Sequence, residues 1–153
     1  MMKIRKAQFT DSEALAALCI TVWIDTYCSE GIEAAHANYV LDEYTAKNLK
    51  QRIVNSTVLV AEVKGSPIGL AILNGKLGEI ETLYVLSRFK GLGAGKALVD
   101  ELKKHTNLEL YLTCWEGNEP ALQFYKRIGF METGETFFEL DGKKIRNVAL
   151  ACS

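Results

Sequence analysis

A glycine-rich segment holds the residues whose types and spacing point most directly to chemistry. It covers residues 90–96 and places Gly91, Gly93 and Gly95 at alternate positions, between an apolar run and a helical pattern. Glycines leave the backbone N–H groups unobstructed, and the N-terminus of a following helix attracts negative charge. The segment therefore predicts either a phosphate-binding loop or a tight turn that uses glycine for its geometry alone.

Two common nucleotide-binding motifs do not fit this segment. The triphosphate-binding loop requires glycine five places before its Gly-Lys pair and Ser or Thr after it, but the chain has Lys90 and Ala97 there. The dinucleotide fingerprint, read from Gly91, places Lys96 where its third glycine belongs. The sequence thus favours an anion site of another kind.

Periodic apolar residues predict the elements that must position the loop. Alternation and short apolar runs predict strands at residues 3–8, 57–63, 68–73, 77–86, 108–115, 130–140 and 144–151. Helical spacing predicts helices at residues 11–25, 45–54, 96–104 and 118–128, with residues 28–44 left ambiguous. Three strands in succession before the loop, the first two joined at residues 64–67, indicate an antiparallel meander.

The composition is that of one ordinary folded domain covering residues 1–153. Hydrophobic residues make up 48% and charged residues 24%, and the formal net charge is -1. The near-neutral charge and the lack of a stripe of basic residues disfavour nucleic acid and anionic membranes as partners. No apolar run approaches the roughly 20 residues that span a bilayer, and the first residues lack the apolar core of a signal peptide. We therefore expect a cytoplasmic protein.

The cysteines and histidines predict no metal site. The four cysteines form no CxxC pair, and the only histidines are His36 and His105. We therefore expect reduced, mostly buried thiols and no metal cofactor.

The loop and the strand before it carry a family resemblance. Residues 83–95 resemble the central motif of the GCN5-related N-acetyltransferases (GNAT), which is Arg or Gln, two residues, Gly, one residue, and then Gly or Ala. Two registers fit, one starting at Arg88 and the other at Lys90. The Lys90 register is preferred, since it places Phe89 at a position that is often aromatic and residues 98–99 at the apolar pair of the helix.

A second block follows at the distance that the family expects. Asn118, Ala121, residues 124–125 and residues 129–130 resemble the family's "N..A..FY...GF" segment. The resemblance implies an α+β fold with three α/β/α layers, the acyl-CoA N-acyltransferase fold. In that fold a mixed, mostly antiparallel sheet has about seven strands, and the fourth and fifth strands splay apart.

Three shorter segments point to a closer branch. Residues 23–27, 79–85 and 115–118 look similar to bacterial polyamine acetyltransferases of the spermidine/spermine type.

The resemblance also implies where acetyl-CoA binds. Its pantetheine arm would lie against the backbone of one strand, its pyrophosphate on the amides of the loop, and its thioester end near an asparagine. The corresponding positions are Leu83, Tyr84 and Val85, then Lys90, Gly91, Leu92, Gly93, Ala94, Gly95 and Lys96, and finally Asn118. Asn118 also fits a simpler role as a helix cap.

Acetyl transfer needs a proton acceptor for the amine and a proton donor for the departing thiolate. Tyr125 is the candidate general acid beside the coenzyme, because a phenol with a pKa of about 10 keeps its proton at neutral pH. Glu79 and Glu81 are candidate general bases, which ideal strand alternation would point the same way, although a bulge would change their faces. The competing interpretations are a core aromatic for Tyr125 and solvated strand charges for both glutamates.

The acceptor pocket is expected around Trp23, Tyr27 and Tyr39, since aromatic faces suit an alkylammonium group. A core role competes with this assignment, most strongly for Trp23. The leading interpretation is direct transfer, in a ternary complex, from acetyl-CoA to the primary amine of a small molecule, with a polyamine as one candidate. The alternatives are protein or peptide N-acetylation and a non-catalytic acetyl-CoA-binding regulatory domain. Many family members dimerise, so a homodimer stays open.

Overall fold

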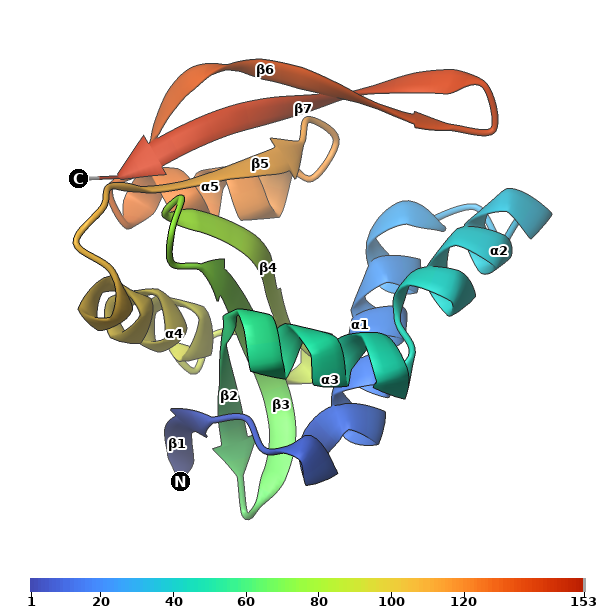
Figure 1. Cartoon of the computed structure of the whole chain (residues 1–153). Coiled ribbons are helices and arrows are strands. Elements are labelled where there is room, and N and C mark those ends of the chain that lie inside the picture. The colour runs from blue at the N-terminus through green and yellow to red at the C-terminus, as the bar shows by residue number, and fades with distance from the viewer. Residues whose placement is uncertain (153) are drawn as a thin grey trace.

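A mixed seven-stranded sheet connects the two halves of the chain in the computed structural model, which describes residues 1–152 (Figure 1). Its strands are β1 (Met2–Lys6), β2 (Thr57–Val63), β3 (Ser66–Asn74), β4 (Glu79–Val85), β5 (Leu110–Trp115), β6 (Met131–Leu140) and β7 (Lys143–Cys152). They lie in the order β1-β2-β3-β4-β5-β7-β6, and each neighbouring pair is antiparallel except β4 and β5. The predicted mixed, mostly antiparallel sheet is confirmed.

The helices are α1 (Ser12–Tyr27), α2 (Ala34–Glu43), α3 (Ala46–Asn55), α4 (Ala94–Leu102) and α5 (Glu119–Arg127), with 3₁₀ turns at Phe9–Asp11, Ser87–Phe89 and Lys103–His105. Polar side chains cap two of the helices. The Thr45 hydroxyl accepts from an N–H of α3 at 3.1 Å, and the Asn118 side chain accepts from an N–H of α5 at 3.3 Å. Within residues 1–152, no helix combines the length and apolarity needed to cross a membrane.

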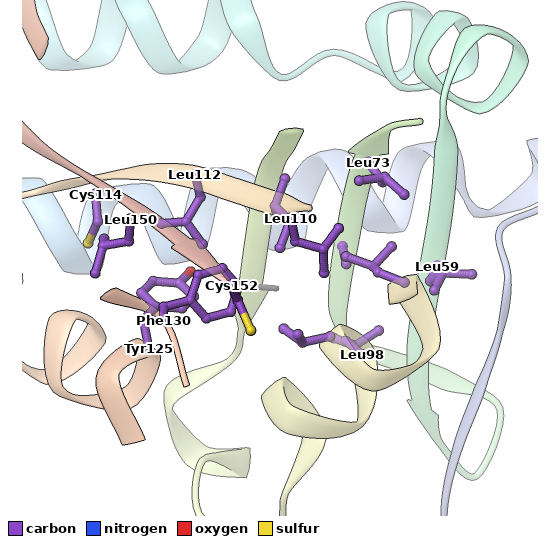
Figure 2. Close-up of a cluster of buried hydrophobic side chains, with 14 of the residues drawn as sticks. Leu59, Leu73, Leu98, Leu110, Leu112, Cys114, Tyr125, Phe130, Leu150 and Cys152 are labelled. Carbon is purple, nitrogen blue, oxygen red and sulfur yellow. The ribbon is translucent and has the colours of Figure 1, made fainter. Parts of the chain in front are cut away.

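Alternating residues of β2 and β3 divide the core between the two faces of the sheet. One face packs against α1 and α3 and includes Val58, Val60, Leu70 and Ile72. The other face packs against α4 and α5 and includes Leu59, Ala61, Ala71 and Leu73, and Figure 2 shows part of this cluster. Because both faces of these strands are covered, the predicted α/β/α layering is confirmed. Each fully buried leucine contributes about 2 kcal/mol of apolar burial.

The sheet opens between β4 and β5. The two strands pair at one position, Glu79 with Tyr111, and the Tyr111 N–H donates to the Gly78 carbonyl at 2.9 Å. Beyond this point they diverge, which confirms the predicted splay of the fourth and fifth strands. On its other edge β4 carries a bulge, since Thr82 and Ile80 pair with consecutive residues of β3 and leave Glu81 as the extra residue.

The structure adds one helix and moves the start of another, and the ends of the other elements lie within two residues of the predicted ones. The ambiguous stretch 28–44 contains α2, a ten-residue helix with one buried residue, Val40. So short a buried face gives little periodic signal. The helix expected at 96–104 begins at Ala94 instead, because Gly93 is its N-cap, and its regular α-form ends at Leu102.

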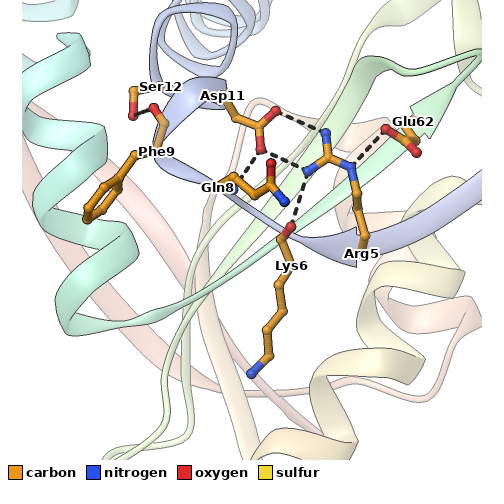
Figure 3. Close-up of polar contacts among 7 residues, drawn as sticks. All are labelled: Arg5, Lys6, Gln8, Phe9, Asp11, Ser12 and Glu62. Atoms are coloured by element: carbon orange, nitrogen blue, oxygen red, sulfur yellow. Dashed lines mark hydrogen bonds and ion pairs between the residues drawn. The ribbon is translucent and has the colours of Figure 1, made fainter.

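An ion-pair network fixes the junction between β1 and α1 (Figure 3). The Arg5 guanidinium donates to both carboxylate oxygens of Asp11, at 2.8 and 2.9 Å, and to Glu62 on β2 at 2.8 Å. The Asp11 carboxylate also accepts from the backbone N–H of Gln8 at 2.7 Å. The hydrogen bonds from Arg5 lower the pKa of Asp11 below its ordinary value of 3.8. The network therefore ties the start of α1 to β1 and β2.

Candidate active site

A cleft of about 640 Å³ is lined by both splayed strands and by the elements around them. Most of the residues predicted for the coenzyme line it, namely Leu83, Tyr84, Val85, Lys90, Gly91, Gly93, Ala94, Gly95, Lys96, Asn118 and Tyr125. The three predicted acceptor residues, Trp23, Tyr27 and Tyr39, line it as well. Among the predicted residues, Leu92 and Glu79 are outside the lining, and Leu92 is 59% exposed. The structure thus brings the loop, the catalytic tyrosine candidate and the aromatic residues into one cavity.

The glycine loop turns sharply into the first turn of α4. Gly91 and Gly93 have φ angles of 89° and 82°, in the left-handed region that strongly favours glycine. Gly93 is the N-cap of α4 and has no side chain with which to cap this end of the helix. The first N–H groups of α4 have no partner within the helix. The loop therefore offers backbone donors at the positive end of a helix dipole.

Basic side chains accompany these donors. Lys90 in the loop and Arg127 at the end of α5 both line the cleft. Lys96 lines it too, and its ammonium pairs with Asp100 one turn along α4 at 2.8 Å. The combination of backbone N–H groups and cationic side chains suits a phosphate-bearing ligand.

The strand β4 supplies an open backbone edge. Leu83, Tyr84 and Val85 pair with β3 on one side, and no residue of β5 pairs with them on the other within the part of the chain that the structure describes. The side chain of Tyr84 turns away from this edge toward α1 and α3, where its hydroxyl lies 3.1 Å from that of Tyr44. Backbone groups of β4 are therefore available to an extended ligand lying in the splay.

Tyr125 enters the cleft from α5. Its ring packs against Phe124 and Phe130 with centroids 5.4 and 5.5 Å apart, and the whole residue is 8% exposed. Figure 2 shows it among the core side chains that surround Phe130. Burial raises the pKa of the Tyr125 phenol well above its ordinary value of 10, so the hydroxyl keeps its proton at neutral pH. Its ring therefore belongs to the core and the residue also lines the cleft, while its role as general acid stays a prediction.

The two glutamates lie in different surroundings. Glu81 lines the cleft, and its carboxylate accepts from the Arg52 guanidinium, which also lies 3.7 Å from Glu43. Glu79 lies at the closed end of the splay, at its pairing with Tyr111. The structure therefore separates two residues that the sequence offered as alternative bases.

Aromatic side chains form the other end of the cleft. Trp23 contacts Tyr27 and Tyr39, with ring centroids 4.6 and 5.2 Å apart. Tyr27 contacts Trp115 at 5.1 Å, and Tyr39 contacts Phe138 at 5.7 Å. Burial raises the pKa of Tyr27 to about 12, so this phenol is neutral at physiological pH. Trp115 and Phe138 were not predicted, because only the fold brings their strands to face α1 and α2.

Comparisons with known proteins agree with this architecture. An acetyltransferase (GNAT) domain model matches residues 23–146. The peptidyl-lysine N-acetyltransferase YjaB of Escherichia coli is 26% identical over 147 residues, covering 94% of this chain and 91% of that protein.

Two solved structures share the fold over nearly their whole length. One is the PaiA N-acetyltransferase of Thermoplasma acidophilum in complex with coenzyme A, with a TM-score of 0.84, 23% identity and coverage of 100% of this chain and 99% of that one. The other is YncA, a putative acetyltransferase of Salmonella typhimurium with acetyl-CoA, with a TM-score of 0.72, 17% identity and coverage of 100% and 94%. The family match, which spans most of the cleft-lining elements, decides the assignment. The chain belongs to the GNAT acetyltransferases and is an acetyl-CoA-dependent N-acetyltransferase.

Proposed function

We propose that the enzyme transfers the acetyl group of acetyl-CoA directly to the primary amine of a small molecule, with a polyamine as one candidate acceptor. The observation that carries this proposal is a single cleft lined by the glycine loop, Tyr125, Glu81 and the aromatic residues. We also propose that residues 1–153 act as one catalytic domain in the cytoplasm. The single sheet, which has β1 and β6 as its two edges, supports this domain assignment.

The donor half of the cleft suits acetyl-CoA. The amides of Gly93, Ala94 and Gly95, with Lys90 and Arg127, would hold the phosphates, and the open edge of β4 would pair with the amide-bearing arm. The coenzyme A and acetyl-CoA present in the two structural relatives support the same co-substrate here. When bound, acetyl-CoA supplies an activated thioester from which an amine takes the acetyl group.

Two groups of the chain are proposed to move protons. The Tyr125 hydroxyl, kept neutral by burial, would donate a proton to the leaving sulfur. The Glu81 carboxylate would accept a proton from the incoming ammonium, directly or through water. Its ion pair with Arg52 holds the carboxylate in one position until the acceptor arrives. Glu79 is the weaker candidate, because it lies outside the cleft lining.

The acceptor half of the cleft suits an alkylammonium group. Tyr27, Tyr39 and Trp23 offer aromatic faces that attract a cation electrostatically. Glu81 lines the cleft as a carboxylate, and its partner Arg52, which also pairs with Glu43, lies outside the lining. A cation is therefore favoured over an anion at this end.

A lysine side chain of a protein is the second candidate acceptor. The relative named as a peptidyl-lysine N-acetyltransferase supports it, because this chain aligns with 91% of that protein. The lysine side chain ends in the same alkylammonium group as a polyamine, so the chemistry of the cleft fits both.

The test is coenzyme A release from acetyl-CoA against an amine panel. The panel contains polyamines, free amino acids, aminoglycosides, lysine-containing peptides and peptides with free amino termini. We expect saturable release with at least one small primary alkylamine and more slowly with lysine peptides. Turnover of lysine peptides alone would favour the second candidate, and no turnover of any amine would reject the proposal.

A further inference from the structure

Five aromatic rings form a continuous chain around the acceptor end of the cleft, which we call the aromatic collar. In order of contact they are Phe138, Tyr39, Trp23, Tyr27 and Trp115. Neighbouring centroids lie between 4.6 and 5.7 Å apart, which places each ring in van der Waals contact with the next. Trp23 is 3% exposed and forms the back of the collar.

The elements that carry the rings close into a loop. Trp23 and Tyr27 belong to α1 and Tyr39 to α2, and these two helices pack against each other. Trp115 ends β5 and Phe138 lies on β6, and both strands pair with β7. Figure 1 shows the β6–β7 hairpin reaching beyond β5 on the side where α1 and α2 lie. The five rings therefore come from four elements that the α1–α2 contact and the shared pairing with β7 hold together.

The two ends of the collar are held in place differently. The Trp115 indole lies over Gly117, where the Cβ of any other residue would overlap the ring. The ring is thus pressed between this turn and Tyr27. Phe138 stands on the edge strand β6, and the residue before it, Phe137, is 59% exposed. Of the two ends, Phe138 is the one that stands on an edge strand of the sheet, paired on one side only.

We propose that the collar admits the acceptor end-on and selects unbranched primary alkylamines, with Phe138 as the specificity-determining residue. The inference rests on the proposed function, since it concerns the acceptor of the same site. A straight methylene chain presents only apolar surface to the rings, and its ammonium is attracted by their faces. A carbon branch beside the nitrogen widens the acceptor where the rings already touch. A carboxylate or amide at that carbon would lose hydration where it meets the apolar ring faces, and a carboxylate would also be repelled by the negative charge of those faces.

The collar thus disfavours α-amino groups of free amino acids and of peptide amino termini. It accepts the terminal amine of a polyamine and the side chain of lysine equally well by shape. This selectivity is a property of the rings and is separable from the chemistry of transfer.

A pair of isomeric amines tests the inference. We compare 1-aminohexane with 2-aminohexane, which have the same atoms but differ in branching beside the nitrogen. The wild-type enzyme should prefer 1-aminohexane by about 10-fold or more in kcat/KM, the discrimination that one misplaced methyl group gives in an apolar pocket. In Phe138→Ala the ratio of the two kcat/KM values should fall close to one, while the affinity for acetyl-CoA stays unchanged. Phe137→Ala, the adjacent exposed phenylalanine, should keep the wild-type preference.

A binding readout separates this inference from the proposed function. Both tryptophans of the chain, Trp23 and Trp115, belong to the collar, so intrinsic tryptophan fluorescence reports on it alone. In the presence of coenzyme A, 1-aminohexane should change the fluorescence at about 10-fold lower concentration than 2-aminohexane. This preference without any acetylation would support the collar and reject the proposed acceptor. The proposed selectivity of the collar would be overturned if both isomers were acetylated with equal efficiency. It would also be overturned if Phe138→Ala kept the wild-type preference.

Discussion

Glu79 and Glu81 stand two residues apart on β4, yet only Glu81, the extra residue of the bulge, lines the cleft. If Glu81 receives the proton of the acceptor, Glu81→Gln should lower kcat/KM by about 10²-fold, the lower range for a general base. Glu79→Gln serves as the matched control and should stay near the wild-type value. Steady-state kinetics with acetyl-CoA and the best amine measure both. Equal losses in the two variants, or none in either, would remove Glu81 from the proposed mechanism.

Tyr125 supplies the second catalytic prediction. Removing its hydroxyl in Tyr125→Phe takes away the proton donor but keeps the ring that packs against Phe130. We expect kcat to fall by about 10²-fold while the dissociation constant of acetyl-CoA stays within about two-fold. Tyr111→Phe, on the paired end of β5 and outside the cleft lining, should change neither value. A Tyr125→Phe enzyme with wild-type kcat would assign the residue to the core alone.

The glycine loop gives a prediction with a control of matched backbone geometry. Gly93 and Gly65 both have a φ angle of 82°, and an added Cβ meets nothing within 4 Å at either position. Alanine at either position should therefore cost about 1 kcal/mol of unfolding free energy. If the amides after the N-cap Gly93 hold the phosphates as proposed, only Gly93→Ala should also weaken acetyl-CoA binding, by about 10-fold. Calorimetric titration with acetyl-CoA and urea unfolding measure the two effects.

Equal acetyl-CoA affinity in the two glycine variants would show that the loop only turns the chain.

The Arg5–Asp11 pair makes stability depend on pH. The pKa of Asp11 is lowered in the folded state, chiefly by its hydrogen bonds to Arg5, so the unfolded state binds the proton more tightly. The pair therefore stabilises the fold fully above pH 3.8, and this contribution is lost as pH falls through the lowered pKa. Asp11→Asn should lose about 1 kcal/mol of unfolding free energy at about pH 6, and the difference from wild type should shrink toward about pH 2.5.

The control for this pair is Asp42→Asn, at an exposed position on α2, which should match wild type throughout. Urea unfolding across the pH range measures all three proteins. A constant difference between Asp11→Asn and wild type at every pH would contradict the ion-pair explanation.

Much of the fold was predictable because its signals are local. The apolar alternation of β2 and β3 and the turn between them are visible in the sequence, as are the caps Thr45 and Asn118. The glycine loop was identifiable because left-handed backbone and a bare helix N-terminus demand glycine there. These features depend on neighbours a few residues away.

The rest depended on contacts between distant residues. The bulge at Glu81 is set by the pairing of β4 with β3, so no sequence pattern within β4 predicts it. Trp115 and Phe138 join the cleft because β5 and β6 both pair with β7. The last strand of the chain therefore lies between two strands that precede it. Phe137 and Phe138 are identical residues side by side, and only the strand's orientation decides which one meets Tyr39.

The central claim is tested most directly by mass spectrometry of the amine products after incubation with acetyl-CoA. The account predicts a primary alkylamine that gains one acetyl group, at a rate that depends on enzyme and falls by about 10²-fold in Tyr125→Phe. Coenzyme A should be released in equal amount. An enzyme that binds acetyl-CoA but acetylates no amine of the panel, or whose product forms equally fast with Tyr125→Phe, would contradict the account.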